Sequence, residues 1–332
     1  MNITKDYIPV FKGIDLSQRR LPVLIADSGE LGPVIGLTAA VHGDEVTGTA
    51  VIQSLFKLLV RFPITKGKIF AFPILNPTGF ETISRHLFYD GADLNRFFHG
   101  TSDGSAAERF ASIILKSILD FKPDLVVDLH TDSANSIAYT LVDKPDALTD
   151  LLALRKSMTL AAKLGFAWAV DTDESVGYPA QNCLTGQLIL RGIPAVTIEL
   201  GGPLIISDTY RKLGLESLWN LLLDQGLVSQ AIPNSTSQKN SQSIDIYTFQ
   251  ERVRTQSTGI IEYRVKPGEI IKKTQVLGII RNVFGETIEV IHSPTDGIVF
   301  SHEDQSVVFP GLALFTIASP TKPGVFPDPI KF

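Results

Sequence analysis

Residues 36–59, GLTAAVHGDEVTGTAVIQSLFKLL, contain the pattern that decides the fold. The segment begins with small and apolar residues, which are typical of a buried strand. Residues 51–59 instead carry apolar side chains at helical spacing. Between the two, His42 and Glu45 stand three residues apart at the carboxyl end of the expected strand. Open α/β sheets place their functional sites at this end of their strands. The segment therefore predicts an α/β fold with a site at a strand-to-helix turn.

The chemical character of this pair points to a metal. Imidazole nitrogen and carboxylate oxygen both bind zinc well, and a catalytic zinc usually takes three protein ligands and one water. A His-x-x-Glu pair alone is more often part of a solvated turn, so a third ligand and a base are needed. Cys183 is the only cysteine, which excludes internal disulfides and cysteine-rich metal sites. Any metal must therefore be held by His, Asp or Glu.

The composition narrows the class of protein. A chain of 332 residues, 44% hydrophobic and 20% charged, is long enough for one large domain and a small one. The net charge of −5 and the lack of a basic cluster argue against nucleic-acid binding. No secretion signal or long apolar run is visible, so we expect a cytoplasmic protein that does not bind membranes. Association into a homo-oligomer is left open.

Apolar segments and helical patterns alternate through residues 1–228. Strands are expected at residues 21–27, 33–41, 67–75, 123–130 and 194–200, and the first two are expected to be adjacent. Helices are expected after residue 45, from a capping box at residues 105–108, and at residues 147–164 and 208–223. The alternation predicts a mixed, mostly parallel sheet flanked by helices, which forms the catalytic domain.

The composition changes after residue 228. Residues 229–245 are polar and predict a linker, and residues 246–332 show short alternating strands separated by Pro-Gly and Asp-Gly turns. This pattern predicts a small all-β domain that resembles a biotinyl/lipoyl-type barrel-sandwich. Residues 280–285, where such carriers have their modified lysine, contain none. We therefore expect the β-domain to cap the catalytic cleft and narrow substrate choice rather than carry a group.

Two further strand ends carry candidate site residues. His130 ends VVDLH, and Asp128 faces the same side of that strand, where it can orient the imidazole. Glu199 lies in the apolar segment AVTIELGG, where a buried carboxylate is costly unless it is paired or protonated. It either reaches solvent at the strand end or, beside a metal-bound water, acts as a general base with a raised pKa.

A long irregular segment supplies polar groups. Residues 76–104 are expected to be a functional loop, because structureless loops of that length are uncommon inside compact domains. Arginine pairs with a carboxylate through two parallel hydrogen bonds, so Asn95 and Arg96 suit the free carboxylate of a small substrate. Arg85 is a candidate to stabilise an oxyanion.

The motifs HGDE, NPTGF, SRHLFYDGADLNRFF, VVDLH and VTIELGG, in this order, resemble the zinc carboxypeptidase clan. Within that clan they are most similar to the succinylglutamate desuccinylase/aspartoacylase family of N-deacylases. The resemblance covers residues 34–202 well and the β-domain more loosely. It implies one zinc ion per chain held by three ligands, which are His42, Glu45 and His130.

The same resemblance implies roles for the other candidates. Glu199 matches the catalytic acid/base, and Arg85 the arginine that polarises the substrate carbonyl. Asn95 and Arg96 match the residues that bind the substrate carboxylate, and Asp93 a carboxylate that orients the first zinc histidine. Arg85 lies farther from the Asp-Leu-Asn-Arg run than in the aspartoacylase branch. This spacing looks more like bacterial deacylases of N-acetylated amino acids.

The sequence therefore predicts a zinc hydrolase that cleaves the amide bond of a small N-acyl amino acid, with Glu199 as general base. Two alternatives stay open. One is a metallocarboxypeptidase acting on short peptides, although a capped cleft would exclude long chains. The other is a binding protein that keeps the pocket without activity.

Overall fold

The computed structural model describes residues 1–145, 151–172, 179–232, 246–249 and 253–321. Its main feature is a large mixed sheet with the strand order β1-β2-β4-β3-β5-β8-β6-β7-β9-β17-β15-β12. The first nine strands are β1 (Asn2–Lys12), β2 (Gln18–Asp27), β3 (Val34–Ala39), β4 (Lys68–Phe72), β5 (Leu125–His130), β6 (Tyr139–Lys144), β7 (Ala167–Thr172), β8 (Ala195–Glu199) and β9 (Ile246–Phe249).

The centre of this sheet is parallel. β4, β3, β5 and β8 run in the same direction, so the carboxyl ends of β3, β5 and β8 meet at one edge. β6 runs antiparallel to β8, whereas β7 and β9 are parallel to β6 and to each other. Every residue of β5 is buried, as expected for a strand with both faces covered. The mixed α/β sheet predicted from the sequence is confirmed.

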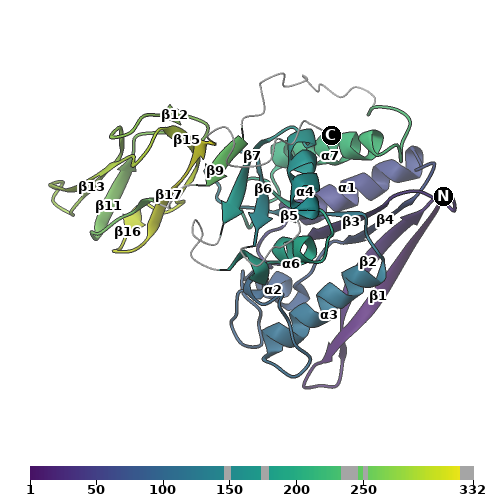
Figure 1. The fold of residues 1–332 in the computed structure, drawn as a ribbon. Helices are drawn as coiled ribbons and strands as arrows, with labels where there is room; N and C mark the ends of the chain where they lie inside the picture. The colour runs from purple at the N-terminus through teal and green to yellow at the C-terminus, as the bar shows by residue number, and fades with distance from the viewer. Residues whose placement is uncertain (146–150, 173–178, 233–245, 250–252, 322–332) are drawn as a thin grey trace.

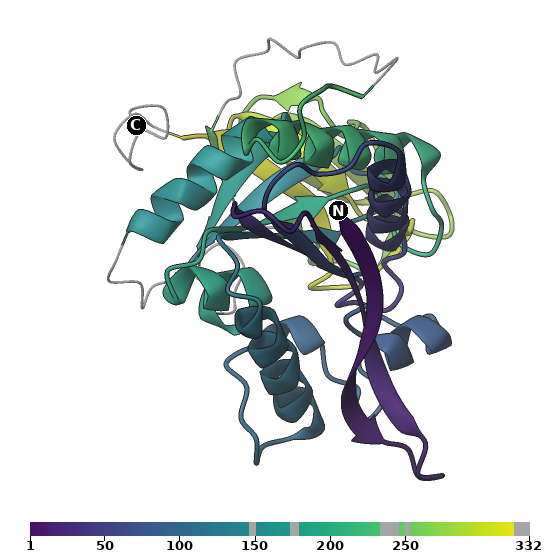
Figure 2. The ribbon, with the colours of Figure 1, turned by 90° about the vertical axis from the view of Figure 1, so that its right-hand side faces the viewer.

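Helices cover both faces of the sheet. One group lies on one side in both views of Figure 1 and Figure 2 and consists of α1 (Thr47–Arg61), α4 (Leu152–Lys163) and α7 (Asp208–Asp224). The other group consists of α2 (Pro77–Thr82), α3 (Ala106–Asp120) and α6 (Leu184–Leu190), with the 3₁₀ turns η1 (Leu94–Arg96) and η2 (Ala180–Asn182). Helix α3 opens with the predicted capping box, in which Ser105 and Glu108 each accept a hydrogen bond from the backbone N–H of the other. Among the described residues, none of the helices has the length and apolar character needed to cross a membrane.

The strand order corrects one prediction. β2 and β3 are not neighbours, because β4 lies between them and pairs with both. The hairpin partner of β2 is β1, which the sequence analysis did not recognise as a strand. The turn at residues 28–32 therefore connects β2, which pairs antiparallel with β1 and β4, to β3, which lies in the parallel centre of the sheet.

The C-terminal region is antiparallel. Its strands are β10 (Val253–Arg254), β11 (Gly259–Tyr263), β12 (Ile270–Ile271), β13 (Val276–Arg281), β14 (Thr287–His292), β15 (Gly297–His302), β16 (Val307–Val308) and β17 (Ala313–Pro320). They enclose a core of their own, which includes Ile261, Leu277 and Ile317. β9 joins this region to the main sheet, because it pairs with β7 on one side and β17 on the other (Figure 1). Residues 233–245 of the predicted linker lie outside the described residues, and the division into two domains stays a prediction.

The C-terminal region also contacts the loop that follows β5. The hydroxyl of Ser133 donates to the carbonyl oxygen of His302 over 2.9 Å, and the N–H of Ile137 donates to the carbonyl oxygen of Phe300 over 2.9 Å. The side-chain amide of Asn135 donates to Asp304 over 3.0 Å. The strand that ends in His130 is therefore followed by a segment that the C-terminal region holds in place.

Candidate metal and catalytic site

The turn after β3 depends on two unusual backbone positions. Ala40 adopts a positive φ of 51°, which turns the chain sharply at the end of the strand. A Cβ on Gly43 would lie 2.0 Å from the carbonyl carbon of Gly79, so no larger residue fits there without moving α2. The N–H of Glu45 then donates to the carbonyl oxygen of His42 over 3.2 Å and closes the turn. This geometry places an imidazole and a carboxylate at the same edge of the sheet.

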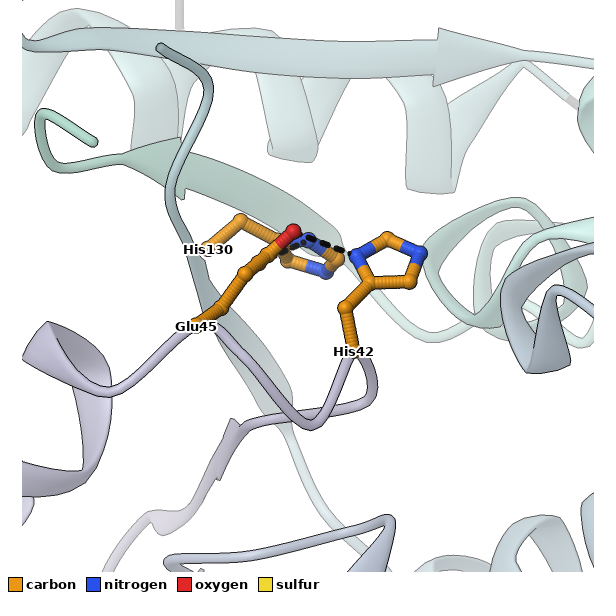
Figure 3. Close-up of side chains that lie close together, drawn as sticks. All are labelled: His42, Glu45 and His130. Carbon is orange, nitrogen blue, oxygen red and sulfur yellow. Dashed lines mark hydrogen bonds and ion pairs between the residues drawn. The ribbon is translucent and has the colours of Figure 1, made fainter. Parts of the chain in front are cut away.

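Three buried side chains converge at this edge. His42 Nδ1 lies 2.5 Å from Glu45 Oε1, and His130 Nδ1 lies 3.1 Å from Glu45 Oε2. Figure 3 shows both imidazoles turned toward the carboxylate between them. One candidate ligand atom from each residue lies within 4.8 Å of the others, and each side chain is at most 4% exposed. The structure thus brings His130 beside His42 and Glu45, which lie far from it in the sequence.

Each imidazole is oriented by a carboxylate on its other nitrogen. His42 Nε2 lies 3.0 Å from Asp93 Oδ1, and His130 Nε2 lies 2.8 Å from Asp128 Oδ2. The hydroxyl of Thr38 donates to the remaining oxygen of Asp128 over 2.6 Å. A ring that donates from Nε2 presents Nδ1 as the lone-pair nitrogen, which is how metal-binding histidines are commonly held.

This donor set fits a divalent cation. Two imidazoles and one carboxylate are a typical ligand set of catalytic zinc, which leaves a fourth position for water. Burial alone would raise the pKa of Glu45, but the adjoining imidazoles of His42 and His130 outweigh it and hold the pKa below its usual value. The carboxyl group is therefore ionised, as a metal ligand requires. The buried His42-Glu45-His130 group could hold a metal ion.

Glu199 lies beside this group. It ends β8, where it pairs in register with His130 of β5 and Tyr139 of β6. The residue is 9% exposed, and its Oε2 atom has no hydrogen-bond partner among the described residues. Burial raises the pKa of this carboxyl group well above its usual value. An unpartnered buried carboxyl group is costly, and such groups are concentrated at functional sites.

The segment between β4 and α3 brings the two arginines to the site. It is less irregular than predicted, because it contains α2 and η1. Arg85 donates to Glu45 Oε1 over 3.3 Å and to Asp93 Oδ2 over 3.1 Å. Arg96 donates to the carbonyl oxygen of Asn95 over 2.8 Å, and one of its amino groups lies 3.8 Å from Asp93 Oδ2. Asp93 thus links the first histidine to both guanidinium groups.

Asn95 is held by the helix across the site. Its side-chain oxygen accepts a hydrogen bond from the N–H of Leu184, the first residue of α6, over 3.0 Å. The amide nitrogen is therefore the part of this side chain that can donate to a ligand.

A cavity of about 440 Å³ connects these groups. Eight of the nine predicted site residues line it, and Asp128 lies behind His130. The lining also includes residues that the sequence analysis had not selected for the site, which are Thr131, Asp132, Tyr139, Leu141, Asp143, Asp171, Cys183, Thr197 and Thr316. His86, His99, His292 and His302 do not line it. Tyr178, whose phenol is a proton donor by chemical type, lies outside the described residues.

Two of the cavity residues that the sequence analysis did not select could have been recognised from the sequence. Asp143 and Asp171 are carboxylates inside apolar segments, the same feature that identified Glu199. They were missed because β6 and β7 were not recognised as strands. Cys183 is buried with its Sγ atom 3.6 Å from an Arg96 nitrogen, and burial raises the pKa of its thiol. A neutral thiol in the wall of the cavity is consistent with packing.

The Asp128 contact gives a first testable prediction. Replacing Asp128 by Asn should weaken metal binding about 10–100-fold, because the imidazole of His130 loses the carboxylate that fixes its tautomer. Competition with a chromophoric chelator measures the change. Asp120→Asn is the matched control, since Asp120 is 63% exposed at the end of α3 and should keep wild-type affinity. Equal affinity of both variants would contradict the assigned role of Asp128.

Comparison with known proteins places this geometry in a family. The sequence model of the succinylglutamate desuccinylase/aspartoacylase catalytic domain matches residues 32–213. The N-alpha-acetyl-L-2,4-diaminobutyric acid deacetylase of Halomonas elongata is 26% identical over 257 residues, which are 77% of this chain and 72% of that protein.

Solved structures agree in fold. The crystal structure of a succinylglutamate desuccinylase/aspartoacylase from Rhodobacter sphaeroides gives a TM-score of 0.80 at 21% identity over 96% of both chains. The product-bound structure of an ectoine utilization protein from Ruegeria pomeroyi gives a TM-score of 0.78 at 20% identity, covering 96% of this chain and 95% of that one. The match of the family model over more than half of the chain, together with the motifs it spans, shows that the chain belongs to the succinylglutamate desuccinylase/aspartoacylase family.

Proposed function

We propose that the protein is a zinc-dependent amidohydrolase, with a zinc-carboxypeptidase-like fold, that removes the acyl group from a small N-acyl amino acid. One observation carries the proposal. A buried His-Glu-His group and an unpartnered buried carboxyl group, Glu199, face the same cavity. This is the combination that metal-assisted hydrolysis of an amide needs.

Each residue then has a defined task. His42, Glu45 and His130 would hold the zinc ion. When bound, zinc supplies Lewis acidity, which lowers the pKa of a water molecule and polarises a carbonyl group. Glu199 accepts the proton of the attacking water and returns it to the leaving nitrogen. The amide C–N bond breaks, a new C–O bond forms, and the products are a carboxylic acid and a free amine.

The arginines act on the substrate. Arg85 donates to the acyl oxygen, on which negative charge develops during the attack. Its contacts with Glu45 and Asp93 hold the guanidinium group in place at the cavity. Asn95 and Arg96 bind the free carboxylate of the amino acid.

The relatives support the reaction class. The Halomonas elongata relative is named for the removal of an acetyl group from an amino acid, and the family is named for desuccinylation and aspartoacylase activity. Hydrolysis of an amide bond in a small N-acyl amino acid is common to these names. We extend this reaction class to the present protein and locate it in the cytoplasm.

We also propose that residues 1–228 form the catalytic domain, residues 229–245 the linker and residues 246–332 the β-domain. The β-domain caps the cleft, because Thr316 of β17 lines the catalytic cavity. A capped cavity of about 440 Å³ favours a small substrate over a peptide.

The proposal is tested by metal analysis followed by a substrate screen. Purified protein should contain about one zinc ion per chain and hydrolyse N-acetyl amino acids faster than blocked dipeptides. A higher rate on the dipeptides would favour a carboxypeptidase. A zinc-loaded protein that hydrolyses neither class would contradict an enzymatic role and favour a binding protein.

The proposed role of Arg96 gives a second prediction. Arg96→Ala should raise KM about 10–100-fold with a smaller change in kcat, because the lost interaction binds the substrate carboxylate before and during reaction. Steady-state kinetics on the best N-acetyl amino acid measure the effect. Arg96→Lys should raise KM less than Arg96→Ala does, because lysine keeps the positive charge. The recovery should be partial, because lysine cannot form two parallel hydrogen bonds with a carboxylate. An unchanged KM in Arg96→Ala would exclude this assignment.

A further inference from the structure

A second cavity, of about 110 Å³, lies at the junction between the main sheet and the C-terminal region. On one side it is lined by Asp132 and Ser133, which follow β5, and on the other by residues 301–303 and 313–316 of the C-terminal region. Asp132 and Thr316 line both this cavity and the catalytic cavity. The second cavity therefore begins where the catalytic cavity ends, and ligand sites occur preferentially at such junctions.

Hydrogen bonds across the junction hold the walls of the second cavity. The hydroxyl of Ser133 donates to the carbonyl oxygen of His302 over 2.9 Å. The carboxylate of Asp304 accepts hydrogen bonds from the backbone N–H groups of Ala134 and Asn135 over 3.1 and 3.3 Å. A cavity with walls fixed in this way is preorganised, so a ligand that enters it pays little for ordering the protein.

Two hydroxyl groups lie side by side in this cavity. Ser301 of β15 and Thr316 of β17 are directly paired in the antiparallel ladder, so their side chains are on the same face of the sheet. Ser301 is 3% exposed. Neither side-chain hydroxyl forms a hydrogen bond with another described residue. A buried hydroxyl needs a partner, which a polar ligand in the cavity supplies.

A third hydroxyl without a partner lies on the catalytic side. Thr131 follows His130 in the sequence, lines the catalytic cavity and is 4% exposed. Its N–H donates to Glu45 Oε2 over 3.0 Å, whereas its hydroxyl has no hydrogen-bond partner among the described residues. Buried polar atoms without partners are rare in native proteins. Unpartnered hydroxyl groups are therefore found both beside the proposed metal ligands and in the second cavity.

The charges around the second cavity disfavour an anionic ligand. Among the described residues, its lining contains Asp132 and Glu303 but no lysine or arginine. A carboxylate placed there would meet like charges, and their repulsion is stronger where burial lowers the dielectric constant. Hydroxyl groups both donate and accept hydrogen bonds, so the lining suits an uncharged polar group.

We propose that the second cavity binds the end of the acyl chain of the substrate, and that this acyl group is short, uncharged and hydroxylated. This inference rests on the proposed deacylase function and specifies the acyl class of that site. The amino-acid half of the substrate is assigned to Asn95 and Arg96, which line the catalytic cavity and not the second one. In a trans amide the acyl chain and the amino-acid carbon extend in opposite directions from the C–N bond. The acyl chain is thus directed toward Thr316 and Ser301.

The volume of the second cavity limits the length of the acyl chain. A volume of about 110 Å³ is the liquid volume of roughly four water molecules, which leaves room for roughly three or four non-hydrogen atoms. A 3-hydroxybutyryl group extends an acetyl group by one CH(OH) and one CH₃ group and fits this limit. An acetyl group alone leaves the second cavity unfilled.

Binding of hydroxamates tests the acyl site without requiring hydrolysis. A hydroxamate carries the same acyl group as the substrate, and its hydroxamic acid group binds zinc. The 3-hydroxybutyryl and 3-methylbutyryl hydroxamates differ only in a hydroxyl that replaces a methyl, and succinic monohydroxamate adds a negative charge. In calorimetry on the zinc-loaded protein, we expect the Kd of the hydroxylated compound to be about tenfold lower than that of the methyl compound, as one or two neutral hydrogen bonds provide. Succinic monohydroxamate should bind most weakly.

Variants assign this preference to residues. Thr316→Val and Ser301→Ala remove one hydroxyl each and should each lower the ratio of the two Kd values, methyl over hydroxyl, about threefold. The double variant should bring the ratio close to one, and an unchanged ratio would overturn the inference. Thr4→Val removes a hydroxyl from an exposed strand position that lines neither cavity and should leave the ratio unchanged. If the double variant fails to fold by circular dichroism, Thr316→Val alone decides.

Kinetics separate this inference from the proposed function. The substrates are the N-acetyl, N-(3-hydroxybutyryl) and N-succinyl derivatives of one amino acid, the one whose N-acetyl derivative is hydrolysed fastest. We expect kcat/KM to be several-fold higher for the hydroxylated acyl group than for acetyl, and lowest for succinyl. The hydroxamate preference without hydrolysis of any substrate would overturn the deacylase function and keep the acyl site. Hydrolysis with equal rates for all three, or fastest for succinyl, would keep the deacylase and overturn the inference.

Discussion

Glu199→Gln is expected to lower kcat by about 10²–10⁴-fold, the range that removal of a general acid/base produces. Glutamine has the same shape as glutamate and can still form hydrogen bonds, but it cannot take a proton from water or return one to the leaving nitrogen. Glu199 is buried at the end of β8 with one oxygen unpartnered, so the substitution removes ionisation without creating a cavity. Steady-state and single-turnover kinetics on the best N-acetyl amino acid measure the loss.

Two controls make this result specific to proton transfer. The Glu199→Gln protein should retain about one zinc ion per chain, since Glu199 is outside the proposed ligand set. Glu286→Gln makes the same chemical change in an exposed residue between β13 and β14, away from the cavity, and should keep wild-type activity. A Glu199→Gln variant within tenfold of wild type would rule out the general-base role, and loss of zinc in that variant would reassign the residue to metal binding.

His42→Ala should release the metal and abolish turnover. His42 supplies one of only three side chains in the group and also anchors Asp93, so its loss should affect affinity more than the about 10–100-fold expected for an orienting carboxylate. Zinc content after dialysis, measured by atomic emission, and kcat on the same substrate give the two readouts.

The matched control for this change is His86→Ala, an exposed histidine that does not line the cavity. It should keep both zinc and activity. Wild-type protein stripped with a chelator should recover activity when zinc is returned, whereas the His42 variant should not. Stoichiometric zinc and normal turnover in His42→Ala would contradict the proposed metal centre.

The sequence predicted the ends of the three site-bearing strands well because their patterns are simple. His42, His130 and Glu199 each follow a mostly apolar run, in which Asp128 is the one charged residue, and buried parallel strands are composed of such runs. That β3, β5 and β8 are neighbours was not contained in the runs themselves, since periodicity reports which face is buried and not which strand is adjacent. The family motifs supplied that information.

The strands that the sequence analysis did not predict share one property: each lacks a continuous apolar pattern. β1 lies at the edge of the sheet and is largely exposed, so it lacks the apolar pattern that marks a buried strand. β6 and β7 each contain a buried aspartate, which interrupts the apolar pattern where the cavity begins. Asp143 and Asp171 both line the cavity, and functional sites are where chains commonly depart from ordinary strand composition.

The junction at β9 limits how far this chain can be shortened. The segment that matches the catalytic-domain sequence model ends at residue 213, yet β7 completes its ladder only with β9, which precedes the C-terminal strands. A chain shortened before β9 would expose the backbone N–H and C=O groups of β7, an open edge that promotes aggregation. It would also release the segment that Asp304 and β15 fasten beside His130. We therefore expect the smallest piece of this protein that keeps the candidate site intact to be the nearly complete chain rather than the matched segment alone.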